Sequence, residues 1–197
     1  MTLFRNHYRV ETTRLREWDY AAAGWYFVTI CTWKMTCFFG EVERGEMGLS
    51  AIGEIADAYW KEIPHHFVNA CLDIHVIMPN HVHGIIGIIT DPDRNDSLDS
   101  QPCRDVACNV STDGFKNPAM SEISPKAGSL GVMMRSYKAA VTRWCRKNGH
   151  DNFGWQARFY DHIIRSERAF EAIRTYILNN PLQWDFDWNH PKHFNHL

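Results

Sequence analysis

Residues 71–89 read CLDIHVIMPNHVHGIIGII. They form two apolar runs, 71–78 and 81–89, and the pair Pro79 and Asn80 between them favours a turn. Each run has the length and apolar character of a strand, so the stretch predicts two neighbouring strands joined by a tight connection. The second strand carries His81 and His83 next to that connection.

Upstream of this pair, the sequence predicts a strand followed by a helix. Residues 25–32 are aromatic and β-branched, follow a glycine and lack helical spacing, which is typical of a strand. Ser50 is suited to cap a helix in which apolar residues recur at steps of three and four as far as Ile63. Pro64 follows the end of that pattern.

Downstream, the sequence predicts a helix, a strand and a last helix. A helix with an apolar stripe and a basic face is expected from Ser129 to Lys147, and residues 155–164 are expected to form a fourth strand. Ser166 is suited to cap the last helix, which Pro181 would end after Asn179. Residues 90–126 are rich in Asp, Ser, Asn and Pro without periodicity, so we expect a flexible insertion within a single domain spanning residues 1–197.

The predicted order is therefore strand, helix, strand, strand, helix, strand, helix. Without its last helix, this order is the split βαβ, or ferredoxin-like, pattern, in which both helices pack on one face of an antiparallel sheet. The expected fold class is α+β. Because this fold hosts metal chaperones, regulatory domains and RNA-binding modules alike, the fold does not assign a function by itself.

The composition is that of an ordinary globular protein. The chain has 197 residues, of which 45% are hydrophobic and 22% charged. No apolar run approaches the roughly 20 residues of a membrane-spanning helix, and the first residues do not resemble a signal peptide, so we expect a cytoplasmic protein without a membrane partner. The six cysteines show no Cys-x-x-Cys pair, so neither a zinc knuckle nor a disulfide framework is indicated.

Charge is unevenly distributed along the chain. The net charge is −2, yet residues 129–180 hold nine Lys or Arg against four acidic residues. The basic face of the helix from Ser129 to Lys147 is uninterrupted by acids, and it consists of Arg135, Lys138, Arg143, Arg146 and Lys147. This face is either only solvated or in contact with a DNA backbone, and the absence of acids favours DNA.

Two pairs of side chains are suited to chemistry. His81 and His83 stand two apart in a predicted strand, so both imidazoles point to one face and can share a cation. In the last helix, Tyr176 and Asn180 lie one turn apart, on the flank of an apolar stripe. Each of these residues also has a simpler interpretation. The histidines can be structural, Tyr176 can be an aromatic residue at the edge of the core, and Asn180 can be an amide that ends the helix.

Two further tyrosines compete with Tyr176 for the role of nucleophile. Tyr137 lies on the apolar stripe of its helix, which indicates a core residue. Tyr160 lies in a predicted strand and has no amide four residues later. We therefore rank both below Tyr176.

Four blocks of sequence stand out along the chain: VIMPNHVHG at 76–84, RSYK at 135–138, WQARFYDHIIR at 155–165 and YILNNP at 176–181. In these blocks and in their order, the chain resembles the REP-associated tyrosine transposases, a branch of the single-tyrosine HUH-type transposases of insertion sequences. The resemblance extends over residues 20–184 apart from the expected insertion. Four blocks are far more specific than a single His-x-His motif.

The resemblance implies that His81 and His83 are metal ligands, Asn180 is the third ligand and Tyr176 is the nucleophile. Some insertion-sequence relatives have Gln in place of Asn180; both supply an amide oxygen, but Asn is one methylene shorter. Two imidazoles and an amide oxygen leave coordination positions for phosphate and water, which suits Mg²⁺ or Mn²⁺ better than structural zinc.

The implied activity is nicking and rejoining of single-stranded DNA at hairpin elements through a 5′-phosphotyrosine. The implied partner is single-stranded or hairpin DNA. A homodimer is also compatible with the resemblance, because some relatives form dimers that exchange the tyrosine helix. Two alternatives stay open: a nickase of the relaxase or replication-initiator type, and a hairpin-binding module without catalytic activity.

Overall fold

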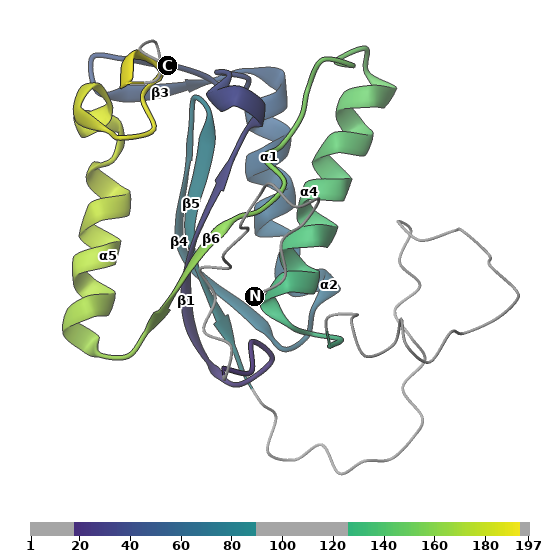
Figure 1. Ribbon diagram of the computed structural model, residues 1–197, viewed down its shortest axis with the longest axis vertical. Coiled ribbons are helices and arrows are strands. Elements are labelled where there is room, and N and C mark those ends of the chain that lie inside the picture. Colours follow the sequence, from purple (N-terminus) through teal and green to yellow (C-terminus); the bar gives the residue numbers. More distant parts are fainter. Residues whose placement is uncertain (1–17, 90–125, 194–197) are drawn as a thin grey trace, which may run out of the picture.

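A computed structural model of the protein describes residues 18–89 and 126–193 (Figure 1). Its main sheet has four antiparallel strands in the order β4-β5-β1-β6. Their bounds are β1 Gly24–Cys31, β4 Ala70–Met78, β5 His81–Ile88 and β6 Tyr160–Ile164. This order is that of the ferredoxin-like pattern, so the predicted fold class is confirmed. The insertion predicted at 90–126 lies outside the described residues, apart from its last residue.

The three long helices lie on opposite faces of this sheet. Helices α1 (Ala51–Lys61) and α4 (Leu130–Lys147) lie side by side on one face, whereas α5 (Glu167–Asn179) covers the other (Figure 1). Two serines cap helices as predicted: Ser50 Oγ accepts from the Gly53 amide, and Ser166 Oγ accepts from the Ala169 amide. A short helix, α2 (Ile63–His66), follows α1.

Strand alternation divides the core into two clusters. Val82 of β5 belongs to the large cluster beneath α1 and α4, together with Tyr26 of β1 and Trp60 of α1. Gly84 is required here, because a Cβ at this position would lie 2.2 Å from the Trp60 ring. On the opposite face, Ile177 of α5 packs with residues of β5 and β6 in a smaller cluster. His81 and His83 alternate with Val82, so they lie on the face that α5 covers.

Two local features differ from the expectation. The first is a hairpin of β2 (Gly40–Glu43) and β3 (Glu46–Leu49), whose turn residues Arg44 and Gly45 have φ values of 54° and 82°. These strands are only four residues long and rich in Glu and Gly, so their sequence carries little strand signal.

The second difference is the fourth strand, which begins at Tyr160 rather than at residue 155. Trp155 makes a single bridge to Thr32, and its ring packs against Phe39 and Tyr137 in the core. The Lys138 ammonium donates to the Gln156 carbonyl, which draws this segment toward α4. Tertiary contacts thus override the strand pattern.

After α5, the chain continues in two 3-10 turns, η2 (Pro181–Phe186) and η3 (Pro191–His193). A further turn, η1 (Trp33–Met35), follows β1. None of the helices within residues 18–89 and 126–193 is both long enough and apolar enough to cross a membrane.

Candidate active site

The two histidines of the His-Val-His motif lie together on β5. Their ring centroids are 4.4 Å apart, and both side chains are buried. The alternation of the strand places Val82 on the opposite face, in the large core. The structure therefore brings His81 and His83 together as their spacing predicts.

Both imidazoles are neutral at neutral pH. Burial lowers the pKa of His81 to about 3, partly offset by the neighbouring Asn180 side chain. Burial lowers the pKa of His83 well below its usual value, and the proximity of His81 is the second largest cause of this shift. The neutral imidazole is the form that binds a metal.

The four ring nitrogens have different surroundings. His81 Nδ1 lies 2.8 Å from Asn80 Oδ1, whereas His81 Nε2 is buried without a hydrogen-bond partner. His83 Nδ1 lies 2.8 Å from the Thr29 hydroxyl, and His83 Nε2 lies 3.1 Å from the Tyr176 hydroxyl. A hydrogen bond at Nδ1 orients each ring and leaves Nε2 directed toward the site.

Tyr176 reaches the histidines from α5. Its ring packs edge-on against Phe27 of β1, with centroids 6.2 Å apart, and against His83 at 5.2 Å. The pKa of Tyr176 is raised to about 12, mainly by burial and to a smaller extent by the nearby carboxylate of Asp187. The Asn180 side chain offsets part of this rise. The phenol is therefore protonated at neutral pH and needs activation before it can act as a nucleophile.

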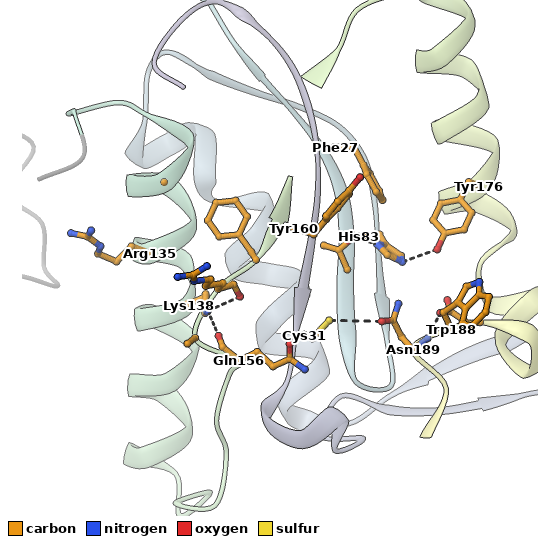
Figure 2. A pocket seen from close by; sticks show the side chains of 16 residues that line it. Phe27, Cys31, His83, Arg135, Lys138, Gln156, Tyr160, Tyr176, Trp188 and Asn189 are labelled. Carbon is orange, nitrogen blue, oxygen red and sulfur yellow. Dashed lines mark hydrogen bonds between the residues drawn. The ribbon is translucent and has the colours of Figure 1, made fainter. Parts of the chain in front are cut away.

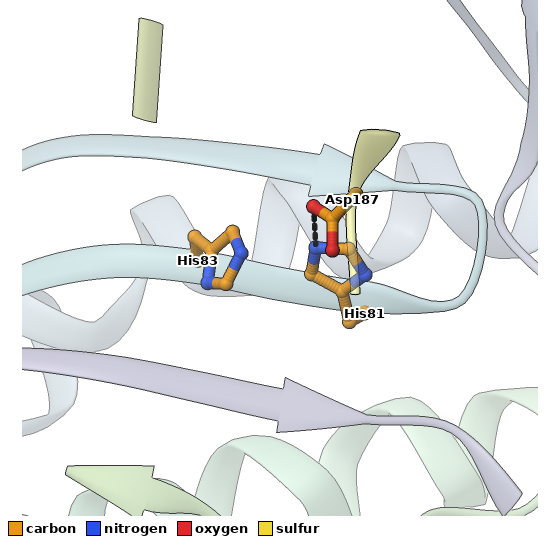
Figure 3. Close-up of side chains that lie close together, drawn as sticks. All are labelled: His81, His83 and Asp187. Atoms are coloured by element: carbon orange, nitrogen blue, oxygen red, sulfur yellow. Dashed lines mark ion pairs between the residues drawn. The ribbon is translucent and has the colours of Figure 1, made fainter. Parts of the chain in front are cut away.

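Asn180 and Asp187 complete the polar cluster. Asn180 Nδ2 donates to Asp187 Oδ2 at 3.1 Å, whereas the buried Asn180 Oδ1 has no hydrogen-bond partner. Asp187 Oδ2 lies 3.8 Å from His81 Nε2 (Figure 3). One potential ligand atom from each of His81, His83 and Asp187 lies within 4.8 Å of the others. Two imidazole nitrogens and a carboxylate oxygen at this separation fit one divalent cation after a small contraction.

Sequence reasoning missed Asp187. It follows Asn180 by seven residues, beyond the irregular turn η2, and no helical or strand period predicts its direction. Its neighbour Asp185 has an 81% exposed side chain, so the residue type alone does not distinguish the two acids. The buried Trp184, whose ring lies 6.0 Å from that of His81, anchors this segment against the site.

An open cavity of about 1240 Å³ adjoins the cluster (Figure 2). His83, Tyr176 and Asp187 line one side, and Trp188 from the segment after η2 is also at its wall. Lys138 and Arg135 of α4 also line it, opposite α5; Figure 2 shows Lys138 at the cavity, whereas the guanidinium of Arg135 points away from it. The cavity thus joins the cluster to part of the basic helix.

The predicted basic residues do not all lie at this cavity. Arg135 and Lys138 line it, whereas three others are exposed on the later turns of α4 and are not among its lining residues: Arg143, Arg146 and Lys147. Of the rival tyrosines, Tyr137 is buried and donates to the Ala56 carbonyl at 3.1 Å, as expected of a core residue. Tyr160 lies at the cavity wall and is half exposed.

The chain is similar to a curated protein and, in fold, to solved structures. No family model matches the chain. An uncharacterized protein of Haemophilus influenzae is 35% identical over 181 residues, which cover 92% of each chain. A solved REP-associated tyrosine transposase bound to a REP hairpin superposes with a TM-score of 0.53 at 16% identity, over 89% of this chain and 76% of that one. The chain therefore belongs to the family of the Haemophilus influenzae protein, and it has the fold of the REP-associated tyrosine transposase, in agreement with the resemblance of its motifs.

Proposed function

We propose that the protein is a metal-dependent transposase that nicks and rejoins single-stranded DNA through a 5′-phosphotyrosine. The observation that carries this proposal is the 3.1 Å approach of the Tyr176 hydroxyl to His83 Nε2, beside a second neutral imidazole. In this arrangement, a nucleophile and metal-binding nitrogens would face the same phosphate of a bound DNA strand. A site that only binds nucleic acid has no use for this combination.

The donor set fits Mg²⁺ or Mn²⁺. His81 and His83 would supply nitrogens to the cation, and Asn180 and Asp187 would supply oxygens. Two buried atoms without hydrogen-bond partners, His81 Nε2 and Asn180 Oδ1, support this assignment, because a cation would satisfy both. When bound, the cation polarises the phosphate and stabilises the charge that develops on the departing oxygen.

The covalent step requires only the tyrosine, the DNA strand and water, and no nucleotide cofactor. The Tyr176 hydroxyl oxygen attacks the phosphorus, and its proton passes to solvent. The bond between phosphorus and the 3′-oxygen breaks, and the 3′-oxygen takes up a proton from water. The products are a 5′-phosphotyrosine and a free 3′-hydroxyl, and attack by another 3′-hydroxyl reverses the chemistry and joins two strands.

The cavity is suited to the strand on either side of the cleaved phosphate. Trp188 is 85% exposed at its wall, and Tyr160 is half exposed there, so both rings are available to stack on bases. Arg135 and Lys138 bring positive charge to the same space, and the three exposed cations on later turns of α4 extend it. We assign this basic face to the DNA backbone.

Hairpin DNA is the substrate that we propose. The solved structure of similar fold is bound to a REP hairpin, and the motifs of this chain resemble those of REP-associated transposases. The proposal includes action in the cytoplasm. The proposed activity is compatible with a monomer and with a homodimer.

A covalent-adduct experiment tests the proposal. The protein is incubated with Mn²⁺ and end-labelled hairpins that carry single-stranded flanks, taken from the DNA around its own gene, and is resolved under denaturing conditions. We expect a labelled adduct that requires Mn²⁺, disappears in Tyr176→Phe and persists in Tyr160→Phe. Binding of the hairpins without any adduct or nick would instead support the binding module.

A further inference from the structure

Asn80 occupies the turn between β4 and β5, directly before His81, and is completely buried. Its Nδ2 donates two hydrogen bonds, to the Met35 carbonyl at 3.0 Å and to the Asn189 carbonyl at 2.7 Å. Its Oδ1 lies 2.8 Å from His81 Nδ1. A carboxamide has two N–H groups, and both are used, so inverting the amide would place Oδ1 against two carbonyl oxygens. The orientation of this side chain is therefore fixed.

The fixed amide determines which nitrogen of His81 carries the proton. Asn80 Oδ1 only accepts hydrogen bonds, so His81 Nδ1 must donate to it. The form of imidazole that binds a metal has one N–H group, and with that group at Nδ1 the lone pair lies on Nε2. This Nε2 has no hydrogen-bond partner and lies 3.8 Å from Asp187 Oδ2. Asn80 thus presents a free lone pair to the position where a cation would lie.

The same amide holds the segment that carries Asp187. Its Nδ2 binds the Asn189 carbonyl, and the Asn189 amide donates to Asp187 Oδ1 at 2.7 Å. Asn189 is therefore held on both sides, by Asn80 at its carbonyl and by Asp187 at its N–H. A buried side chain between β4 and β5 links the histidine strand to an acidic residue more than a hundred positions away.

We propose that Asn80 is a positioning residue of the metal site, which selects the Nδ1–H tautomer of His81 and holds Asp187 beside it. The inference rests on the proposed function for the identity of the ligand, a divalent cation. The tautomer itself is a property of the protein without metal. The two parts can therefore be tested separately.

The first readout is the tautomer of His81 in metal-free protein, measured by long-range proton–nitrogen correlation NMR. We expect the Nδ1–H form in the unaltered protein. In Asn80→Ala, the Nε2–H form should become populated, because Nδ1 loses Asn80 as its acceptor, whereas a proton on Nε2 faces the carboxylate of Asp187 3.8 Å away. Asn69→Ala is the matched control: Asn69 Nδ2 also ties two distant segments through a carbonyl, that of Gly128 at 2.9 Å, but at the opposite end of β4.

The second readout is Mn²⁺ affinity, measured from the electron paramagnetic resonance signal of free Mn²⁺. We expect Asn80→Ala to weaken binding about 10- to 100-fold, as is usual for residues that orient metal ligands, and Asn69→Ala to leave it unchanged. Should Asn80→Ala fail to fold, Asn80→Ser, which leaves a hydroxyl and space for water, should show the same changes.

Two results would overturn different claims. A folded Asn80 variant that keeps the Nδ1–H tautomer and full Mn²⁺ affinity would refute the positioning role. Failure of the unaltered protein to bind Mn²⁺ would refute the metal site of the proposed function, while the tautomer measurement would still decide whether Asn80 orients His81.

Discussion

The Tyr176 hydroxyl lies 3.1 Å from Nε2 of His83, although the two residues are 93 positions apart in the chain. The contact exists because α5 packs on the face of the sheet that His83 shares with Ile85, through Ile177. The opposite face is covered by α1 and α4, so the phenol and the imidazoles are separated from the main core by the sheet itself.

Divalent cations should stabilise the protein through the histidine pair. At 100 times the dissociation constant, Mn²⁺ bound only to the folded state adds about 2.7 kcal/mol to the free energy of unfolding. We expect the melting temperature of the unaltered protein and of the exposed control His162→Ala to rise with Mn²⁺. The melting temperature of His81→Ala should not respond, and an equal rise in that variant would place the cation elsewhere.

Trp188 should contribute to binding of single-stranded DNA. Replacing it by Ala should weaken binding by about 1–3 kcal/mol, the usual contribution of one stacked base, without changing protein stability, because the side chain is 85% exposed. Phe186 is the matched control, since it is 84% exposed on the same segment but does not line the cavity. Fluorescence anisotropy with a labelled oligonucleotide measures the DNA affinity of the Trp188→Ala and Phe186→Ala variants. An equal loss of affinity in the two variants would show that Trp188 makes no specific stacking contact.

The exposed cations on the later turns of α4 should contact phosphates. Changing Arg143 and Lys147 together to Ala should reduce the slope of log affinity against log salt by roughly one unit for each phosphate that the variant no longer neutralises. Lys61→Ala, on α1, should leave that slope unchanged. A slope that stays constant in the double variant would show that this part of α4 is only solvated.

Acid should destabilise the protein partly through His75. Burial lowers the pKa of His75 below 6.5, and its hydrogen bond to Asp57, at 2.8 Å, offsets only part of that effect. Because the folded state takes up this proton less readily than the unfolded chain, His75 costs no unfolding free energy above pH 6.5, and the free energy of unfolding declines through this group as the pH falls below that value. His75→Gln should reduce the loss of unfolding free energy between pH 7 and pH 5, measured by urea denaturation. The exposed His162→Gln should retain the loss, and an unaltered pH dependence in His75→Gln would contradict the argument.

The parts of the structure that sequence predicted are those that local patterns determine. Ser50 and Ser166 cap their helices because a cap depends on the next three residues, and His81 and His83 share a face because strand alternation is a local property. The fold class follows from the order of these elements. The chemical roles of Tyr176 and the histidines stay predictions.

The parts that sequence could not predict depend on tertiary contacts. Trp155 leaves the strand pattern because its ring packs in the core, and short strands rich in Glu and Gly pair at residues 40–49. Asp187 lies in the site and Asp185 is exposed, because the buried Trp184 anchors η2, the turn that precedes Asp187. No periodicity distinguishes these two acids, so only the path of the chain after α5 does.

The separation of the site along the chain has a consequence for biosynthesis. The ribosome makes both histidines more than ninety residues before it makes Tyr176, and Asp187 comes later still. A nascent chain that has formed β5 therefore holds the imidazoles without a nucleophile and without the carboxylate. Under the proposed function, a translating chain has no means of cutting DNA until α5 and the turn after it have emerged and docked on the sheet.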